Sequence, residues 1–141
     1  MKNNRMLTIG GSFSIMASIL HIAIIIGGSD WYRFFRAGEK MAVMAEQGSW
    51  IPGIITLGIA AILFVWGLYA FSGAKVLRHL PFLKSVLVIV SGIYLIRGLA
   101  LIPVFVIIPE QVDEFSVWSS LLSLLIGLAY TVGTKQEWLN L

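Results

Sequence analysis

The feature that most constrains this chain is an apolar stretch over residues 86–108 that contains a single charged side chain, Arg97. A helix needs about 20 apolar residues to cross the hydrocarbon core of a bilayer, so this stretch is long enough to span it. Arg97 lies at the midpoint, with eleven residues on either side. Arginine keeps its proton in proteins and is costly in hydrocarbon, which makes Arg97 a functional-site hypothesis.

The composition predicts an integral membrane protein with a single domain over residues 1–141. The chain is 58% hydrophobic and 12% charged, with a mean hydropathy of +0.90, whereas soluble domains have about 25% charged residues. The absence of cysteine excludes disulfides and thiolate metal sites. The two histidines, His21 and His79, fall on opposite sides of the predicted membrane, so we expect no metal site, and nothing predicts a cofactor or nucleic-acid binding.

Four apolar segments predict an all-α membrane protein, a bundle of four transmembrane helices. They cover residues 6–26, 50–71, 82–108 and 115–132. The first segment is too long for a signal peptide and no cleavage motif follows it, so we expect a retained helix. Pro103 should kink the third helix, because it frees the carbonyl of Leu99.

Small and hydroxyl residues at helical spacing predict the faces that meet inside the bundle. In the first segment these are Gly11, Ser14, Ser18, His21 and Ile25; in the second, Gly53, Thr56, Ala60, Leu63, Gly67 and Ala70; in the fourth, Ser116, Ser119, Ser120, Ser123, Gly127 and Tyr130.

The segment between the first two spans predicts an amphipathic helix over residues 30–46. Its apolar side carries Trp31, Phe34, Phe35 and Met41, which we expect at the membrane interface, while Arg33, Arg36 and Lys40 lie on the other side. Two roles remain open for this helix: an interfacial anchor, or a lid over the bundle.

The placement of lysine and arginine predicts the orientation. One side of the membrane holds six of these residues: Lys2, Arg5, Lys75, Arg78, Lys84 and Lys135. The other side holds three: Arg33, Arg36 and Lys40. The side richer in lysine and arginine is usually cytoplasmic, so we expect both termini in the cytoplasm.

Arg97 has no carboxylate inside a predicted span to pair with. Two interpretations stay open: an arginine that fixes helix packing, or one that faces a cavity holding water or a ligand. For the second, the candidate ligand-binding residues are Arg97, His21, Ser18, Tyr94, Ser119 and Ser123. His21 is either hydrogen-bonded to a neighbouring helix, or a proton relay or ligand contact.

Several short motifs resemble small uncharacterised four-helix proteins of the bacterial inner membrane. The motifs cover residues 31–39, 48–52, 69–73, 78–81 and 94–98. The helix-bearing loop after the first span is also loosely similar to the layout of DoxX-like membrane proteins. The resemblance implies a fold and a location, and carries over no activity or site residue.

The interpretation that we favour is a non-catalytic inner-membrane protein that binds an amphiphile (a lipid, quinone or fatty acid) or serves as an accessory subunit of a membrane complex. An anionic amphiphile would suit Arg97. The first alternative is a homo-oligomeric channel or transporter with Arg97 in the pathway. The second is an intramembrane enzyme that acts on a lipid, with His21 as the acid–base group, although no nucleophile or carboxylate accompanies it.

Overall fold

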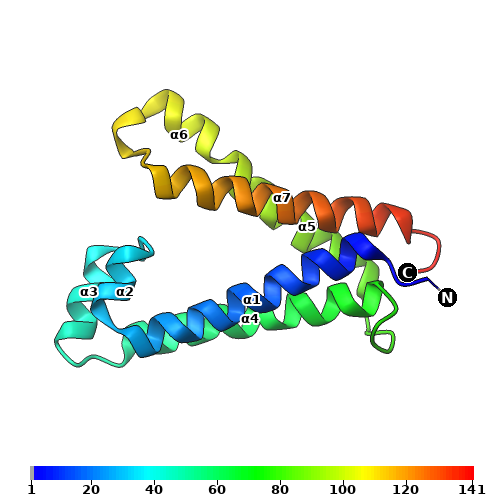
Figure 1. The fold of residues 1–141 in the computed structure, drawn as a ribbon, viewed down its shortest axis with the longest axis horizontal. Helices are drawn as coiled ribbons and strands as arrows, with labels where there is room; N and C mark the ends of the chain where they lie inside the picture. The colour runs from blue at the N-terminus through cyan, green and yellow to red at the C-terminus, as the bar shows by residue number, and fades with distance from the viewer. Residues whose placement is uncertain (1) are drawn as a thin grey trace. The chain divides into compact units, whose positions relative to one another are not determined.

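The structure, a computed structural model, describes residues 2–141, and this part of the chain contains helices and no strand (Figure 1). The elements are α1 (Arg5–Gly27), α2 (Ser29–Phe34), α3 (Glu39–Glu46), α4 (Ile51–Gly73), α5 (Leu83–Leu99), α6 (Leu101–Ile107), the short 3-10 helix η1 (Pro109–Gln111) and α7 (Glu114–Gln136). Four stretches are long and apolar enough to cross a membrane: Arg5–Gly27, Ile51–Gly73, Leu83–Ile107 and Glu114–Gln136. The predicted all-α fold with four such helices is confirmed.

The chain forms two compact units. Unit 1 contains residues 2–13 and Trp66–Leu141, so it holds the first part of α1, the last part of α4, and all of α5, α6, η1 and α7. Unit 2 contains Ser14–Val65, which is the rest of α1 and α4 together with α2 and α3.

Helices α1 and α4 pack through their small residues in both units. In unit 1, a Cβ on Gly11 would lie 3.0 Å from Cβ of Ala70, so the two helices approach closely there. In unit 2, the Ser18 hydroxyl donates a hydrogen bond of 2.7 Å to the carbonyl of Ala60. The predicted faces of these two helices are therefore confirmed at these contacts, where small residues let backbones approach and hydroxyls bond across the helices.

The third span is interrupted at Ala100, three residues before Pro103. Proline lacks an N–H, and its ring clashes with the carbonyl four residues earlier, which is that of Leu99. The structure accordingly ends α5 at Leu99 and begins α6 at Leu101, with a long backbone bond of 3.5 Å from Val104 N to Ala100 O. The span predicted over residues 82–108 is thus present as Leu83–Ile107, and the kink predicted from Pro103 is a break between α5 and α6.

Helices α5 and α7 lie side by side and make the densest packing of unit 1 (Figure 1). Two glycines permit this approach: a Cβ on Gly98 would meet the Leu124 backbone, and one on Gly127 would lie 2.9 Å from the Leu95 backbone nitrogen. The α7 helix begins with a side-chain cap, since Asp113 accepts a hydrogen bond of 2.8 Å from the Ser116 backbone N–H.

The predicted single helix over residues 30–46 is wrong, because two short helices, α2 and α3, occupy this segment. Between them, Arg36 has a φ of 57° and Gly38 a φ of 106°. A helix requires a negative φ, and the Gly38 conformation is one that residues with a Cβ rarely adopt. The apolar spacing continues through this point, so the pattern alone does not show the break.

A small core in unit 2 joins α2 and α3 to the end of α1. It contains Ile24, Tyr32 and Ala42, with Phe35 and Met41 packed against it. Tyr32 is only 2% exposed, and its hydroxyl lies 3.1 Å from the hydroxyl of Thr56 on α4. Trp31 and Phe34, in contrast, are 41% and 67% exposed. Of the four residues predicted on one apolar side, two therefore contribute to the protein core, and two remain available to a membrane interface.

The two ends of the chain meet in unit 1. The Asn4 side chain donates a hydrogen bond of 2.9 Å to Gln136, and the Asn4 backbone N–H bonds the Ala74 carbonyl at the end of α4. Next to this contact, Lys75 forms an ion pair of 2.8 Å with Glu137, which directly follows α7. The start of α1 and the ends of α4 and α7 are thus tied together by polar side chains.

Candidate functional site

Arg97 lies near the end of α5 and reaches across to α7. Its Nη1 atom donates hydrogen bonds to the Ser123 hydroxyl at 2.7 Å and to the Ser119 carbonyl at 3.2 Å. Two of the predicted partners of Arg97 therefore do meet it, one through its side chain and one through its backbone. They lie one helical turn apart on α7, on the side that its serines and glycines form.

The opposite edge of the guanidinium makes no hydrogen bond with the part of the chain that the structure describes. Arg97 is exposed, and its Nε and Nη2 atoms form no hydrogen bond with any group in residues 2–141. No carboxylate in that range lies within ion-pair distance of it. Nε and Nη2 present N–H groups in the fixed fork that matches a carboxylate or a phosphate, so this edge can bind one such group with two parallel hydrogen bonds.

The guanidinium lies well inside the predicted membrane. Ser119 and Ser123 are five and nine residues from the first residue of α7, Glu114, so at 1.5 Å of rise per residue they lie about 8 and 14 Å from that end. Charge at such depth is disfavoured unless it finds polar partners. The two serine contacts satisfy one nitrogen and leave the positive charge without an anion.

Tyr94, one turn before Arg97, belongs to a buried aromatic cluster. Its ring lies 5.4 Å from that of Trp66 and 5.5 Å from that of Tyr130, measured between centroids. The Tyr130 hydroxyl in turn donates to the Trp66 carbonyl at 3.1 Å. The structure thus places Tyr94 in the packing between α4, α5 and α7, where it supports the helix that carries Arg97.

Ser18 and His21 belong to unit 2, and the structure gives both of them partners there. The Ser18 hydroxyl is used in its bond to Ala60, where it is buried. His21 bonds through Nδ1 to the carbonyl of Ala17, 2.7 Å away in its own helix. A carbonyl only accepts, so Nδ1 carries the proton. The predicted bond from His21 to a neighbouring helix is therefore replaced by one within α1.

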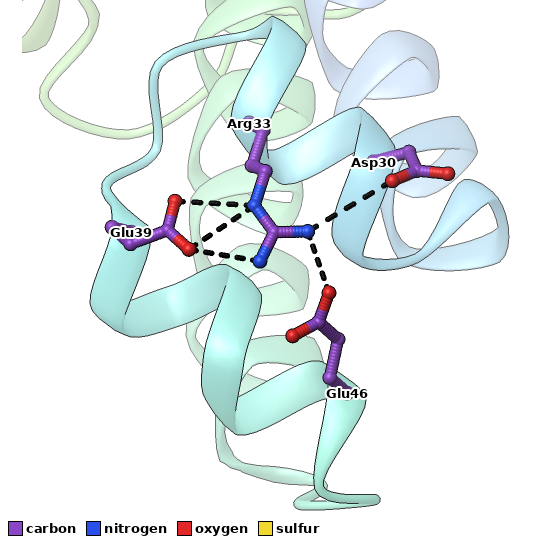
Figure 2. A network of polar contacts seen from close by, with 4 residues as sticks. All are labelled: Asp30, Arg33, Glu39 and Glu46. Atoms are coloured by element: carbon purple, nitrogen blue, oxygen red, sulfur yellow. Dashed lines mark hydrogen bonds and ion pairs between the residues drawn. The ribbon is translucent and has the colours of Figure 1, made fainter.

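A second polar group, in unit 2, centres on Arg33 (Figure 2). Arg33 donates to Glu39 through Nη2 at 2.8 Å and to Glu46 through Nη1 at 2.6 Å, so α2 is tied to both ends of α3. These hydrogen bonds raise the pKa of Arg33 and lower the pKa values of Glu39 and Glu46. The charged groups of Arg33, Glu39 and Glu46 are paired with one another at the surface. This ion-pair cluster, which we call the clamp, therefore holds α2 against α3 and is not a ligand site.

A groove between α5 and α7 in unit 1 was not predicted from the sequence. It has a volume of about 530 Å³. Its lining residues are Val88, Ser91, Gly92, Leu95, Thr131, Thr134, Lys135 and Trp138. On α5 the sequence pattern of the groove can be recognised, because its lining residues 88, 91, 92 and 95 recur at helical spacing. On α7 the pattern cannot be recognised from the sequence. Residues 134–138 are polar enough to suggest a short tail after the helix, whereas α7 continues to Gln136.

A comparison of the chain with protein-family profiles, with curated proteins and with solved structures found no match. The resemblance to small four-helix inner-membrane proteins therefore stays a prediction.

Proposed function

We propose that this protein is a small, non-catalytic membrane protein that binds an anionic amphiphile, whose headgroup pairs with Arg97. The observation that supports this most directly is the unused edge of the Arg97 guanidinium, at a depth where water is scarce. A carboxylate or phosphate there would satisfy Nε and Nη2 and neutralise the charge. Ile93, one turn before Arg97 on α5, is exposed and would contact the apolar tail.

The headgroup chemistry favours some amphiphiles over others. A fatty acid or a phospholipid presents two anionic oxygens to the guanidinium fork, whereas a quinone presents one neutral carbonyl. A charge-assisted bidentate pair is stronger and more directional than a single neutral hydrogen bond. Fatty acids and anionic phospholipids are therefore the ligands that we expect, and the quinone is the weaker candidate.

We further propose that the protein resides in the bacterial inner membrane with both termini in the cytoplasm. Two observations support this: the side with six of the lysine and arginine residues contains both termini, and Asn4 and Gln136 are hydrogen-bonded, so the two ends of the chain meet. An even number of spans also puts both termini on one side of the membrane.

Native mass spectrometry from mild detergent, after adding oleate, tests the proposal. Arg97→Gln should weaken retention of the amphiphile about 10-fold to 100-fold, the range expected for losing hydrogen bonds to a charged group. Arg97→Lys keeps the charge without the fork and should retain part of the binding. Arg5→Gln makes the same change in net charge at an exposed position, far along the chain from this site, and should have no effect.

The remaining interpretations predict other outcomes. If Arg97→Gln folds and retains the amphiphile as the native protein does, the site at Arg97 is excluded. A ring of copies with Arg97 lining a pore would appear as a homo-oligomer whose anion flux in liposomes is lost in Arg97→Gln. An accessory subunit would be recovered with a second protein, and an enzyme would convert the added lipid.

A further inference from the structure

The groove between α5 and α7 has an apolar floor and a positively charged end. Val88, Gly92 and Leu95 line it along α5. A Cβ built on Gly92 would meet no atom within 4 Å, so the floor there is open space. From Val88 to Leu95 the helix rises about 10 Å, so the groove runs along the helix axis over about two turns.

Lys135 in the groove lining and Lys84, one turn before the lining residue Val88, have no acidic partner in the part of the chain that the structure describes. Lys84 lies one turn before Val88, and its ammonium sits 4.4 Å from the centroid of the Trp138 ring. Lys135 lines the groove from α7 and is exposed. Neither forms an ion pair within the described range 2–141, and Glu137, the carboxylate nearest to Lys135 in sequence, is bound to Lys75 at 2.8 Å.

Thr134, the residue before Lys135, adds a polar group to the groove lining. It is 4% exposed and lines the groove, and its hydroxyl finds no hydrogen-bond partner in the part of the chain that the structure describes. A buried hydroxyl without a partner costs free energy, and an acceptor from a bound molecule would remove that cost.

We infer that this groove binds one acyl chain of an anionic phospholipid, with the headgroup phosphate between Lys84 and Lys135. The order of groups along the groove matches the order along a lipid: two cations for the phosphate, the Thr134 hydroxyl at the level of the ester oxygens, and an apolar slot for the chain. Trp138 lies at the headgroup level, where membrane proteins concentrate tryptophan. Lysines near a membrane surface also attract anionic lipids.

The site is independent of the one proposed at Arg97. Successive residues of a helix are rotated by about 100°, so Arg97 and the groove residues Val88 and Leu95 project from nearly opposite sides of α5. The groove lining also includes Lys135, next in sequence to Gln136, which bonds Asn4. A variant of Arg97 should consequently leave lipid binding in the groove unchanged, which separates the two proposals.

Fluorescence quenching of Trp138 tests the inference. In a variant that keeps Trp138 and carries phenylalanine at Trp31, Trp50, Trp66 and Trp118, a small fraction of brominated phosphatidylglycerol in the bilayer should quench more strongly than the same fraction of brominated phosphatidylcholine. We expect a preference of about fivefold for each lysine that contacts the headgroup. Lys84→Gln with Lys135→Gln should abolish the preference.

A substitution in the floor of the groove provides the steric test. Gly92→Leu should fill the slot and reduce quenching by both lipids. Gly58→Leu on α4 is its matched control, because Gly58 also lies in a helix, and a Cβ placed there would have no atom within 4 Å. Equal quenching by the two lipids in the parent protein, or an unchanged signal in Gly92→Leu, would overturn the inference.

Lipid binding in the groove can also be tested in the native protein, without replacing any tryptophan. In native mass spectrometry from bilayers that contain both lipids, it should retain phosphatidylglycerol in preference to phosphatidylcholine. Gly92→Leu should lose that lipid, whereas Gly58→Leu and Arg97→Gln should keep it. Retention of only a free fatty acid, or of both lipids in their bilayer proportion, would contradict the assignment.

Discussion

Gly98 of α5 lies against the backbone of Leu124 in α7: a Cβ built on Gly98 would come within 2.7 Å of the Leu124 nitrogen. A backbone atom cannot rotate away as a side chain can, so any residue larger than glycine must push the helices apart. Because Arg97 precedes Gly98 and Ser123 precedes Leu124, this approach is also what brings the arginine within reach of α7.

Gly98→Ala should destabilise the protein by about 1–3 kcal/mol, the usual cost of overpacking a tight contact. Gly92→Ala is the control in the same helix, since no atom lies near a Cβ there. Alanine favours helix over glycine, so the control should be neutral or up to about 1 kcal/mol more stable. Thermal unfolding in detergent micelles compares the two, and equal stabilities would show that the backbone contact is not formed.

Ser123→Ala should weaken binding of an anionic amphiphile by about tenfold without removing it, because Nη1 of Arg97 loses its hydroxyl acceptor and the guanidinium becomes less fixed. Ser123→Thr keeps the hydroxyl and should restore binding. Ser120→Ala, on the same helix, removes a hydroxyl that does not bond Arg97 and should leave the dissociation constant unchanged. A Ser123→Thr protein that binds no better than Ser123→Ala would exclude this positioning role.

The ion pair between Lys75 and Glu137 should make stability depend on pH. The hydrogen bond from Lys75 lowers the pKa of Glu137 below its ordinary value of 4.5, and the Glu137 side chain is only 12% exposed. A lowered folded-state pKa means that the contribution is complete above about pH 4.5 and is lost as the pH falls through the lower, folded-state pKa. Thermal unfolding across this range should show the loss.

The variant Glu137→Gln identifies the part of the pH dependence of stability that comes from the ion pair with Lys75. The variant should be less stable than the parent at neutral pH, and the difference should shrink as the pH falls below 4.5. Glu110→Gln, an exposed change in η1, should follow the parent across the same range. A constant difference between parent and Glu137→Gln at every pH would mean that the ion pair does not form.

Arg33→Gln should loosen the α2–α3 segment, because it releases both Glu39 and Glu46 at once. Hydrogen exchange of the amides in residues 29–46 should become faster than in the parent. Lys40→Gln removes an equal charge from the same segment at an exposed position outside this clamp, and should leave exchange unchanged. Similar acceleration in both variants would indicate a general effect of charge and not the clamp.

Cysteine labelling in intact spheroplasts tests the topology, and the native chain has no cysteine to interfere. Cysteines at positions 40 and 112 should react with an impermeant reagent from outside. Cysteines at positions 3 and 77 should react only after the membrane is opened. Labelling of position 77 in intact spheroplasts would reverse the proposed orientation.

The local pattern of the sequence was sufficient for the elements and their inner faces. Periodic apolar segments predicted four spans, and small residues predicted the contacts that Gly11, Ser18 and Ala60 make. Pro103 predicted the disruption at Leu99 and Ala100. The pattern failed at Gly38, because apolar spacing continues on both sides of a residue whose positive φ ends any helix.

The sequence by itself determined that the chain is helical and apolar enough to cross a membrane, and that Arg97 is the only charged residue of the stretch 86–108, since both follow from composition and spacing along one segment. Only the tertiary structure decided which side chains Arg97 meets, that Ser18 and His21 have other partners, and that α5 and α7 form a groove lined by Lys135. The reason is physical. Spacing fixes the side of a helix on which a residue lies, but its partners depend on how closely and in what register two helices pack, which here is set by glycines meeting backbone across α5 and α7.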